Sequence, residues 1–279
     1  KILSRTVLPE AFHGIAFTPD GKRIVASGAG KEVIHLFDFQ KGSLANANTV
    51  ALRPASERGI PAGIAVSPDG RKVWVANVLG QSVTEVALQG GTNAGTVVRD
   101  IQLGERTASP VAGEKDPWHD LDEESITKRA RALLEVLNTE APYPFACLPD
   151  VARDRLYISH WGRAEVGVLE LSSGRKLARW PVQEHPNEMV LNRAGSFLFV
   201  ANANRNTISV LETAGGSCVE TLAAELEPDS PPGSTPNRVA LSPDESLLFV
   251  SNANINAIAV FDVRQPGRSR SMGFIPTGW

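Results

Sequence analysis

The feature of this sequence that most restricts its fold is a unit of roughly 40 to 50 residues that recurs along the chain. Its clearest copies begin at Gly63, Met189 and Arg238 and read GIAVSPDGRKVWVANVLGQSVTEVAL, MVLNRAGSFLFVANANRNTISVLE and RVALSPDESLLFVSNANINAIAVFDV. A fourth copy begins at Gly14, and a more divergent one, FACLPDVARDRLYISHWGRAEVGVLEL, begins at Phe145. Such units must stack against one another, because a single unit cannot bury its own apolar face.

Each copy predicts antiparallel strands joined by tight turns. In the copy at Gly63, Pro68 presets the first corner of a turn, and Asp69 and Gly70 supply side-chain capping and a positive φ. After this turn, apolar residues alternate with period two, and a second alternating run follows a small polar loop. The expected fourth strands are Thr49–Leu52, Thr96–Leu103, Arg175–Val182, Ser217–Ala223 and Arg270–Pro276. Four strands per unit predict an all-β fold, a β-propeller of four-stranded antiparallel blades, in place of a β-sandwich.

The segments SPDG…VWVAN, FVANANRNTISVLE and FVSNANINAIAVFDV resemble the YVTN-type β-propeller repeat family over most of the chain. The stretch PPGSTPNRVALSPDESLLFVSNANINAIAVFDV, with GFIPTGW after it, is similar to the N-terminal propeller of bacterial proteins that carry a phosphoesterase domain behind it. No segment of the sequence has the Asp/His clusters and the Ser or Thr nucleophile of such a domain. The resemblance implies a parent architecture, a seven-bladed ring, and a periplasmic or extracellular location.

The expected single domain, 1–279, contains five blades at about residues 13–52, 62–103, 144–182, 187–223 and 236–276. Ile2–Leu8 reads as one surplus strand, so the chain is expected to form part of a larger ring. The alternative is a closed five-bladed ring in which Ile2–Leu8 pairs with Ala257–Val263 and displaces Arg270–Pro276.

An insertion at 104–141 separates the second and third blades. Asp120 or Asp122 can cap a helix, and the sequence predicts an amphipathic helix over about Leu121–Asn138. It is expected to pack either on the propeller or on a partner through an apolar stripe of Ile126, Ala130, Leu133, Leu134 and Leu137. The nearby acidic cluster is interpreted as a solvated helix start without a metal, because one His among flexible carboxylates fixes no geometry; it comprises Asp116, His119, Asp120, Asp122, Glu123 and Glu124.

Composition excludes some partners. The formal net charge is −3, and there is no basic run, so nucleic acid is not an expected partner. No apolar stretch reaches the roughly 20 residues of a membrane-spanning helix.

Cys147 and Cys218 fall on an inner and an outer strand of different blades, and both are expected to be buried, unpaired thiols.

In a propeller, the interblade links and the loops between second and third strands emerge on one face, around the central channel. Most copies place Ala-Asn or Ser-Asn in these loops, where Asn has a structural explanation because it bonds nearby backbone. The third copy has Ser159-His160-Trp161-Gly162 instead, and the fourth begins with His185-Pro186-Asn187. These departures predict either simple loop contacts or a ligand site at the channel, formed by His160, Trp161, His185, Asn187 and Arg205, with Asn77, Asn202 and Asn252 ringed nearby.

The sequence shows no complete catalytic constellation such as GxSxG or a metal-ligand spacing. The expected function is therefore a non-catalytic scaffold without a cofactor, binding a protein or a small molecule at the channel face. The alternative is a small-molecule hydrolase similar to the propeller lactonases, which share SPDG and VAN-like repeats. Its acid and base groups would come from His160, His185, Arg205 and Glu188.

Overall fold

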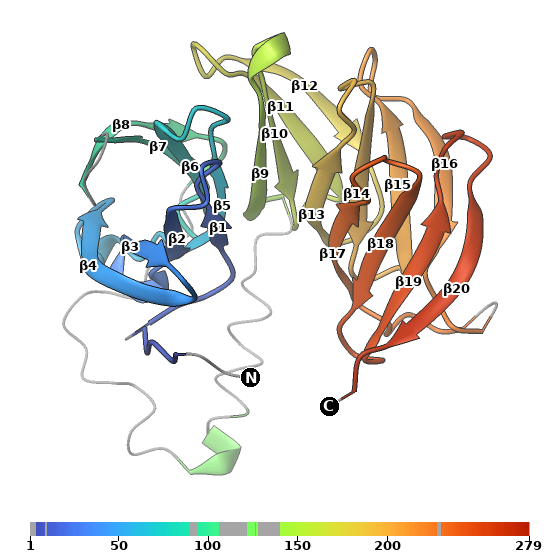
Figure 1. The fold of residues 1–279 in the computed structure, drawn as a ribbon, viewed down its shortest axis with the longest axis horizontal. Coiled ribbons are helices and arrows are strands. Elements are labelled where there is room, and N and C mark those ends of the chain that lie inside the picture. Colours follow the sequence, from blue (N-terminus) through green and yellow to red (C-terminus); the bar gives the residue numbers. More distant parts are fainter. Residues whose placement is uncertain are drawn as a thin grey trace.

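A computed structural model describes residues 4–8, 10–89, 94–105, 122–125, 127, 140–227 and 230–278. These residues form five antiparallel four-stranded sheets, numbered here as blades 1 to 5 in chain order (Figure 1). Within each blade the strands lie side by side in sequence order. The β-propeller class expected from the repeat is therefore confirmed, with the same number of four-stranded units.

The strands of the blades have the following bounds. Blade 1 comprises β1 (Ile15–Phe17), β2 (Arg23–Ser27), β3 (Val33–Gln40) and β4 (Ser43–Ala51), and blade 2 comprises β5 (Pro61–Val66), β6 (Lys72–Asn77), β7 (Ser82–Leu88) and β8 (Gly95–Gln102). Blade 3 comprises β9 (Pro144–Asp150), β10 (Arg155–His160), β11 (Glu165–Glu170) and β12 (Lys176–Pro181). Blade 4 comprises β13 (Pro186–Leu191), β14 (Phe197–Asn202), β15 (Thr207–Glu212) and β16 (Cys218–Ala223), and blade 5 comprises β17 (Pro236–Leu241), β18 (Leu247–Asn252), β19 (Ala257–Asp262) and β20 (Arg270–Pro276). Short 3₁₀ helices occupy Ala29–Lys31, Ala55–Glu57 and Val151–Arg153.

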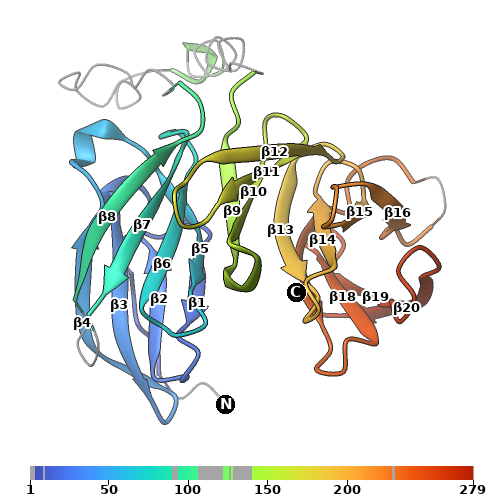
Figure 2. The ribbon, with the colours of Figure 1, turned by 90° about the horizontal axis from the view of Figure 1, so that it is seen from above.

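The first strand of each blade is the innermost, and consecutive inner strands contact one another along the series β1, β5, β9, β13 and β17. Figures 1 and 2 show blades 1 and 2 on one side, blade 3 in the middle and blades 4 and 5 on the other side. The core is divided into layers that lie between neighbouring blades. Stability therefore depends on each blade burying one face against the next.

The alternating apolar residues of the second strands fill these layers. Val75, Val200 and Val250 occupy equivalent positions in β6, β14 and β18, and each is fully buried. Val75 packs with blade 1, Val200 with blade 3 and Val250 with blade 4. The prediction that these valines are buried between sheets is confirmed.

The turn between first and second strands follows the SPD pattern. The Ser67 hydroxyl donates to Asp69 Oδ1 over 2.5 Å, and that carboxylate accepts the backbone N–H of Arg71. Gly70 then adopts a φ of 69°, the conformation that favours glycine. The same Ser-Asp contact recurs between Ser242 and Asp244. Local side-chain chemistry thus determines the first hairpins of blades 2 and 5.

Three expectations need correction or qualification. Cys147 is a buried free thiol as expected, but Cys218 is exposed, because it starts the outermost strand of blade 4. Residues 4–8 form no strand, and Arg270–Pro276 pairs with Ala257–Asp262, so the displacement required by the closed five-bladed alternative does not occur.

In the insertion, residues 123–125 are helical, and Asp122 caps them by accepting the Ser125 N–H over 2.8 Å. The expected apolar stripe, Asp116, His119 and Asp120 lie outside the described residues.

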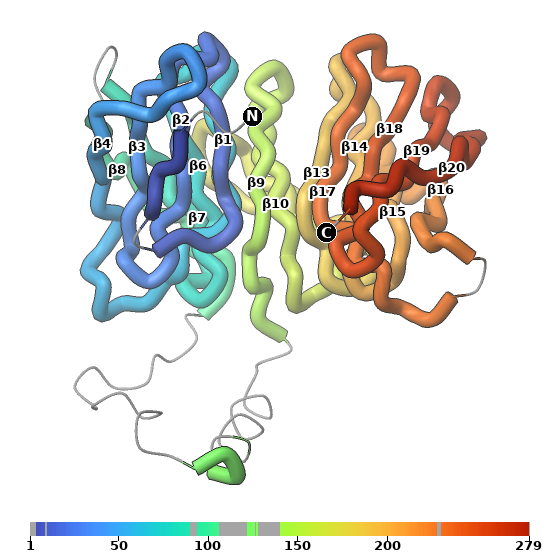
Figure 3. The backbone as a smooth tube through the Cα atoms, turned by 60° about the horizontal axis from the view of Figure 1, so that its bottom comes forward, coloured from blue at the N-terminus to red at the C-terminus, as the bar shows by residue number. Residues whose placement is uncertain are grey.

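The faces of blades 1 and 5 that point away from their neighbouring blades are partly open. Ile15 and Phe17 of β1 are 55% and 52% exposed, and Ile275 of β20 is 48% exposed. Figure 3 shows the described blades as two groups on either side of β9 and β10. No helix in the described part of the chain is long and apolar enough to cross a membrane.

Candidate functional site

The interblade links and the loops between second and third strands meet at one end of the sheets, called here the channel face. Trp161 N–H donates to the carbonyl of Tyr143, and Ala203 N–H donates to the carbonyl of His185. Equivalent bonds join Val78 to Ile60 and Ala253 to Thr235. The expected shared face is therefore present in blades 2 to 5.

Each inner strand in blades 2 to 5 carries a register shift at the channel face. In β13 the shift lies between Pro186 and Met189, and in β17 it lies between Pro236 and Arg238. Strands β5 and β9 shift at the corresponding place. A bulge leaves residues out of the regular ladder and changes the direction of their side chains.

One aligned position, at or beside these shifts in blades 2 to 5, contains small residues in three blades and charged residues in two. Gly14, Gly63 and Ala146 occupy it in blades 1 to 3, whereas Glu188 and Arg238 occupy it in blades 4 and 5. A Cβ at Gly14 would lie 2.1 Å from the Ala62 carbonyl oxygen, and one at Gly63 would lie 2.3 Å from that of Phe145. The small residues thus allow inner strands to approach closely, and blades 4 and 5 depart from this pattern.

The charged residues meet His13, which immediately precedes Gly14. His13 Nε2 lies 2.7 Å from Glu188 Oε1, although the two residues are 175 positions apart. Arg238 Nη2 donates to the His13 carbonyl oxygen over 3.3 Å and lies 3.8 Å from Glu188 Oε1. The His13 ring also packs against Phe145, with ring centroids 4.5 Å apart. Blades 1, 3, 4 and 5 therefore contribute to one His–Glu–Arg cluster.

Asn187 lies beside this cluster, in the same bulge as Glu188. Its Nδ2 donates to Asn237 Oδ1 over 3.1 Å, and its buried Oδ1 has no hydrogen-bond partner among the described residues. A buried amide oxygen without a partner is costly to leave unsatisfied. Asn187 therefore stays a candidate residue that would accept a hydrogen bond from a ligand.

Trp161, His185 and Arg205 lie in the loops at the same face. The rings of Trp161 and His185 stack with centroids 3.7 Å apart and planes inclined by 7°, which confirms their expected proximity. Burial lowers the pKa of His185, against a small raising effect of Glu184. Arg205 Nη2 instead forms an exposed ion pair with Glu184 Oε1 at 2.6 Å. Arg205 is therefore neutralised locally.

The expected ring of asparagines around the channel is wrong. Asn77 Nδ2 donates to Ser82 and Thr84, and Asn202 Nδ2 donates to Thr207 and Ser209. These partners belong to the third strands, one strand further from the channel. Asn252 Nδ2 bonds the Ala224 carbonyl of blade 4. The three side chains are buried, so their role is the structural one that Asn chemistry suggests.

His160 also differs from expectation, because its ring leaves the channel cluster and enters the space between blades 2 and 3. Its Nδ1 lies 2.9 Å from Glu165 Oε1, while Trp161 continues toward His185. Sequence reasoning named Glu188 but did not combine it with His13. The signal available was the aligned position that reads Gly, Gly, Ala, Glu and Arg.

Chemically, a carboxylate bonded to one imidazole nitrogen holds the ring in a single tautomer and leaves the other nitrogen as a base. The His13–Glu188 pair has that arrangement, with a guanidinium beside it. Among the described residues, no group of three or more His, Cys, Asp or Glu side chains gathers as a metal site would require.

Known protein families and solved structures resemble this chain in part. A family model described as SMP-30/Gluconolactonase/LRE-like region matches residues 10–117, which is less than half of the chain. No curated protein matches at a significant level. Candidate 6-phosphogluconolactonases from Bacteroides uniformis and Bacteroides fragilis superpose with TM-scores of 0.65 at 13% and 14% identity, covering 94% of this chain and 70% and 69% of theirs. Kuenenia stuttgartiensis hydrazine synthase superposes with a TM-score of 0.58 at 14% identity, covering 93% of this chain and 78% of that one. At these identities the structural matches establish the β-propeller fold, and a fold shared with such different proteins does not assign an activity.

Proposed function

We propose that this protein is a small-molecule hydrolase that opens cyclic esters, or lactones, at the channel face. The observation that carries the proposal is the 2.7 Å contact between His13 and Glu188, with Arg238 beside it. The partial family match and the two candidate lactonases with the same fold support this function over a non-catalytic scaffold.

In the proposed reaction, Glu188 accepts a hydrogen bond from the Nε2–H of His13, so that the unprotonated Nδ1 is the base. Nδ1 takes a proton from water as the water oxygen adds to the lactone carbonyl carbon. The carbonyl electrons move to their oxygen, where the Arg238 guanidinium stabilises the negative charge. The bond from the carbonyl carbon to the ring oxygen then breaks, and His13 returns the proton to that oxygen. The product is a hydroxy acid.

The test is the hydrolysis of six-carbon sugar δ-lactones, with and without a phosphate group, followed in a pH-stat against the uncatalysed rate. The unchanged protein is expected to accelerate ring opening. His13→Gln and Glu188→Gln are each expected to lower kcat by about a hundredfold or more, because each removes the proton-transfer pair. Both substitutions preserve a polar side chain of similar size.

Arg175→Gln is the matched control, because it removes an exposed Arg–Glu pair (Arg175 Nη2 to Glu170 Oε1, 2.7 Å) far from the channel face. Its rate is expected to equal that of the unchanged protein. A folded protein that hydrolyses none of these lactones would contradict the proposal and favour the scaffold function. Equal rates in all three variants would contradict the assignment of His13 and Glu188.

We also propose that the complete ring contains more than five blades. The supporting observation is the apolar face left half-open at each end of the series, at Phe17 of β1 and Ile275 of β20. Class averages of the purified full-length protein by electron microscopy are expected to show a ring with further blades between these faces. A closed ring of five blades in those images would refute this proposal.

A further inference from the structure

A cavity of about 390 Å³ lies between blades 2 and 3, outside the channel cluster. We call it the blade 2–3 cavity; its lining includes Leu103, which follows β8, and His160, Arg163, Gly167, Lys176 and Arg179 of blade 3. Its volume falls within the usual range for small-molecule sites. Comparison with the spaces between the other neighbouring blades explains why this one is open.

In blades 2 and 4, the equivalent place is filled by a hydrogen-bonded latch. Asn77 Nδ2 lies 2.9 Å from Thr84 Oγ1, and Asn202 Nδ2 lies 2.9 Å from Ser209 Oγ. The strand registers make His160 the counterpart of these asparagines and Gly167 the counterpart of Thr84 and Ser209. Blade 3 has therefore lost the hydroxyl that would complete the latch.

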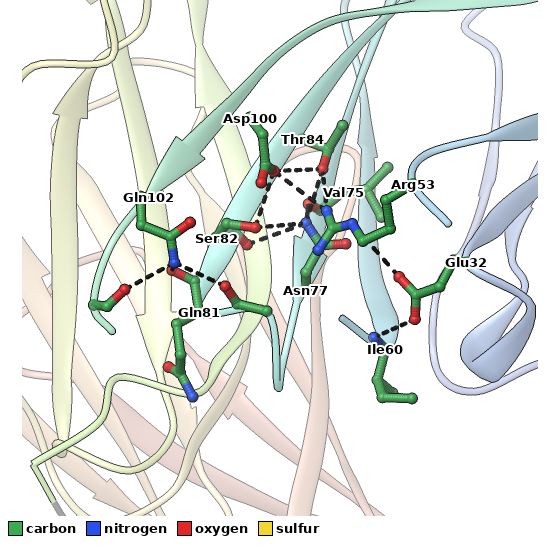
Figure 4. A network of polar contacts seen from close by, with 12 residues as sticks. Glu32, Arg53, Ile60, Val75, Asn77, Gln81, Ser82, Thr84, Asp100 and Gln102 are labelled. Atoms are coloured by element: carbon green, nitrogen blue, oxygen red, sulfur yellow. Dashed lines mark hydrogen bonds and ion pairs between the residues drawn. The ribbon is translucent and has the colours of Figure 1, made fainter. Parts of the chain in front are cut away.

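The crevice between blades 1 and 2 is closed by a side chain from the link. Arg53 Nη2 donates to Thr84 Oγ1 over 2.8 Å and pairs with Asp100 Oδ1 at 3.3 Å (Figure 4). Between blades 3 and 4, the equivalent link residue Gln183 accepts from the Thr207 hydroxyl over 2.5 Å. Between blades 2 and 3 that link position is Gly104, because Leu52, Leu103 and Val182 make the same backbone bond at the end of each fourth strand. Two glycines thus replace two filling side chains.

His160 points into this emptied region. Its ring lies against Gly167, where an added Cβ would be 2.6 Å from Nε2. The side chain is 6% exposed, and Nε2 is buried without a hydrogen-bond partner among the described residues. Burial lowers the pKa of His160 despite the raising effect of Glu165. Burial alone would raise the pKa of Glu165, but the His160 hydrogen bond and the neighbouring arginines hold it below its usual value. Neutral His160 therefore donates from Nδ1 and keeps an acceptor lone pair on Nε2.

The rim of the cavity is cationic. Arg163 and Arg179 lie 3.7 and 3.8 Å from the two Glu165 oxygens, and Lys176 Nζ donates to the Leu103 carbonyl over 3.1 Å. Two arginines flank the Glu165 carboxylate, and Lys176 adds a third cation to the lining, which leaves a local positive excess. Leu103, Leu169 and Ala178 supply an apolar wall. The site thus offers an acceptor at its base and charge for an anion at its mouth.

We propose that the blade 2–3 cavity binds a small hydroxylated carboxylate, with a hydroxyl donating to His160 Nε2 and the carboxylate paired with Arg179 and Arg163. The two arginines provide charge-assisted bonds, and the buried imidazole discriminates for a hydroxyl group. This proposal does not rest on the proposed hydrolysis at the channel face.

The test is isothermal titration of the full chain with gluconate as the probe. Sorbitol, which lacks the carboxylate, and hexanoate, which lacks the hydroxyls, are the matched control ligands. Gluconate is expected to bind at least about tenfold more tightly than either. Equal binding of hexanoate, or no binding of gluconate at millimolar concentration, overturns the proposal.

The decisive variant is His160→Asn/Gly167→Thr, which restores the latch of blade 2. It is expected to fold, because the same latch exists elsewhere in this chain, and to weaken gluconate binding by about tenfold or more. Arg179→Gln on the rim is expected to weaken it while leaving the His160–Glu165 contact in place. Arg264→Gln, which removes a 72% exposed arginine of blade 5, is expected to bind gluconate normally. Unchanged binding in the double variant, or an equal loss in Arg264→Gln, overturns the proposal, and retained binding without lactone hydrolysis refutes only the hydrolase.

Discussion

Val200→Asp is expected to lower the free energy of unfolding by several kcal/mol, on the order of 3 to 5. Val200 is fully buried in β14, in the core layer between blades 3 and 4. Its neighbours in that layer include Val168, Leu198 and Leu211, none of which carries a polar group that could compensate a carboxylate. A loss of this size removes a large part of a typical domain's stability. Urea unfolding followed by tryptophan fluorescence measures it.

Val219→Asp is the control for this prediction. Val219 lies in β16 of the same blade, but it is 40% exposed, so the new carboxylate stays hydrated. The melting temperature is expected to fall markedly for Val200→Asp and to change little for Val219→Asp. If both variants melted at the temperature of the unchanged protein, the core assignment of β14 would be wrong.

Arg53→Met is expected to cost about 3 to 5 kcal/mol of unfolding free energy at neutral pH, because it leaves a buried carboxylate without its cation. Arg53 and Glu32 are 6% and 0% exposed in their side chains, and Arg53 Nε lies 3.5 Å from Glu32 Oε2. The other Glu32 oxygen accepts the Ile60 N–H over 2.7 Å (Figure 4). Gly59 leaves space for the guanidinium, since a Cβ there would lie 2.1 Å from Nη1. Arg53 thus connects blades 1 and 2.

The loss in Arg53→Met is expected to depend on pH. Burial raises the pKa of Glu32, and Arg53 opposes that effect, so removing Arg53 raises this pKa further. When a carboxyl has a higher pKa in the folded than in the unfolded protein, ionising it destabilises the fold as the pH rises toward the folded pKa. Below the unfolded pKa of about 4.3 the carboxyl is protonated in both states, and this destabilisation is absent. The destabilisation should therefore be larger at pH 7 than near pH 4. Denaturant titrations at both pH values measure it.

Glu32→Gln/Arg53→Met separates the buried charge from the loss of packing. Gln keeps an acceptor for the Ile60 N–H and removes the charge that Arg53 balanced. The double variant is expected to recover much of the stability lost in Arg53→Met and to show little pH dependence between pH 4 and 7. A double variant as unstable as Arg53→Met at both pH values would show that packing alone explains the effect.

The blades could be predicted from the sequence, because the residues that indicate each turn and strand lie within a few positions of one another. Pro68, Asp69 and Gly70 build a turn within a few residues, and period-two alternation assigns Val75 and Val200 to a core whatever lies on the other side. The solvent exposure of Cys218 could not be predicted in the same way. It depends on whether an outer strand is covered by other parts of the molecule, which no local pattern states.

The candidate sites could be predicted from the sequence only in part. The sequence marked His185-Pro186-Asn187 as a departure from the repeat and named Glu188 as a candidate group, and the loop rule correctly placed Trp161 near His185. The direction of the His160 ring was decided by Gly167 on the adjacent strand, which leaves the room that a side chain fills in blades 2 and 4. A rotamer chosen by a neighbouring strand cannot be deduced from the residue's own position.

By itself, the sequence determined the β-propeller class, the order of strands within each blade and the buried face of each second strand, because these follow from turn chemistry and side-chain alternation over a few residues. Only the tertiary structure decided that His13 meets Glu188 across 175 positions and that the crevice between blades 2 and 3 is open. The first depends on how separate blades are placed around one axis, because His13 and Glu188 share no strand, turn or repeat unit. The second depends on how blade 3 packs against the end of blade 2, which no turn or alternation pattern states.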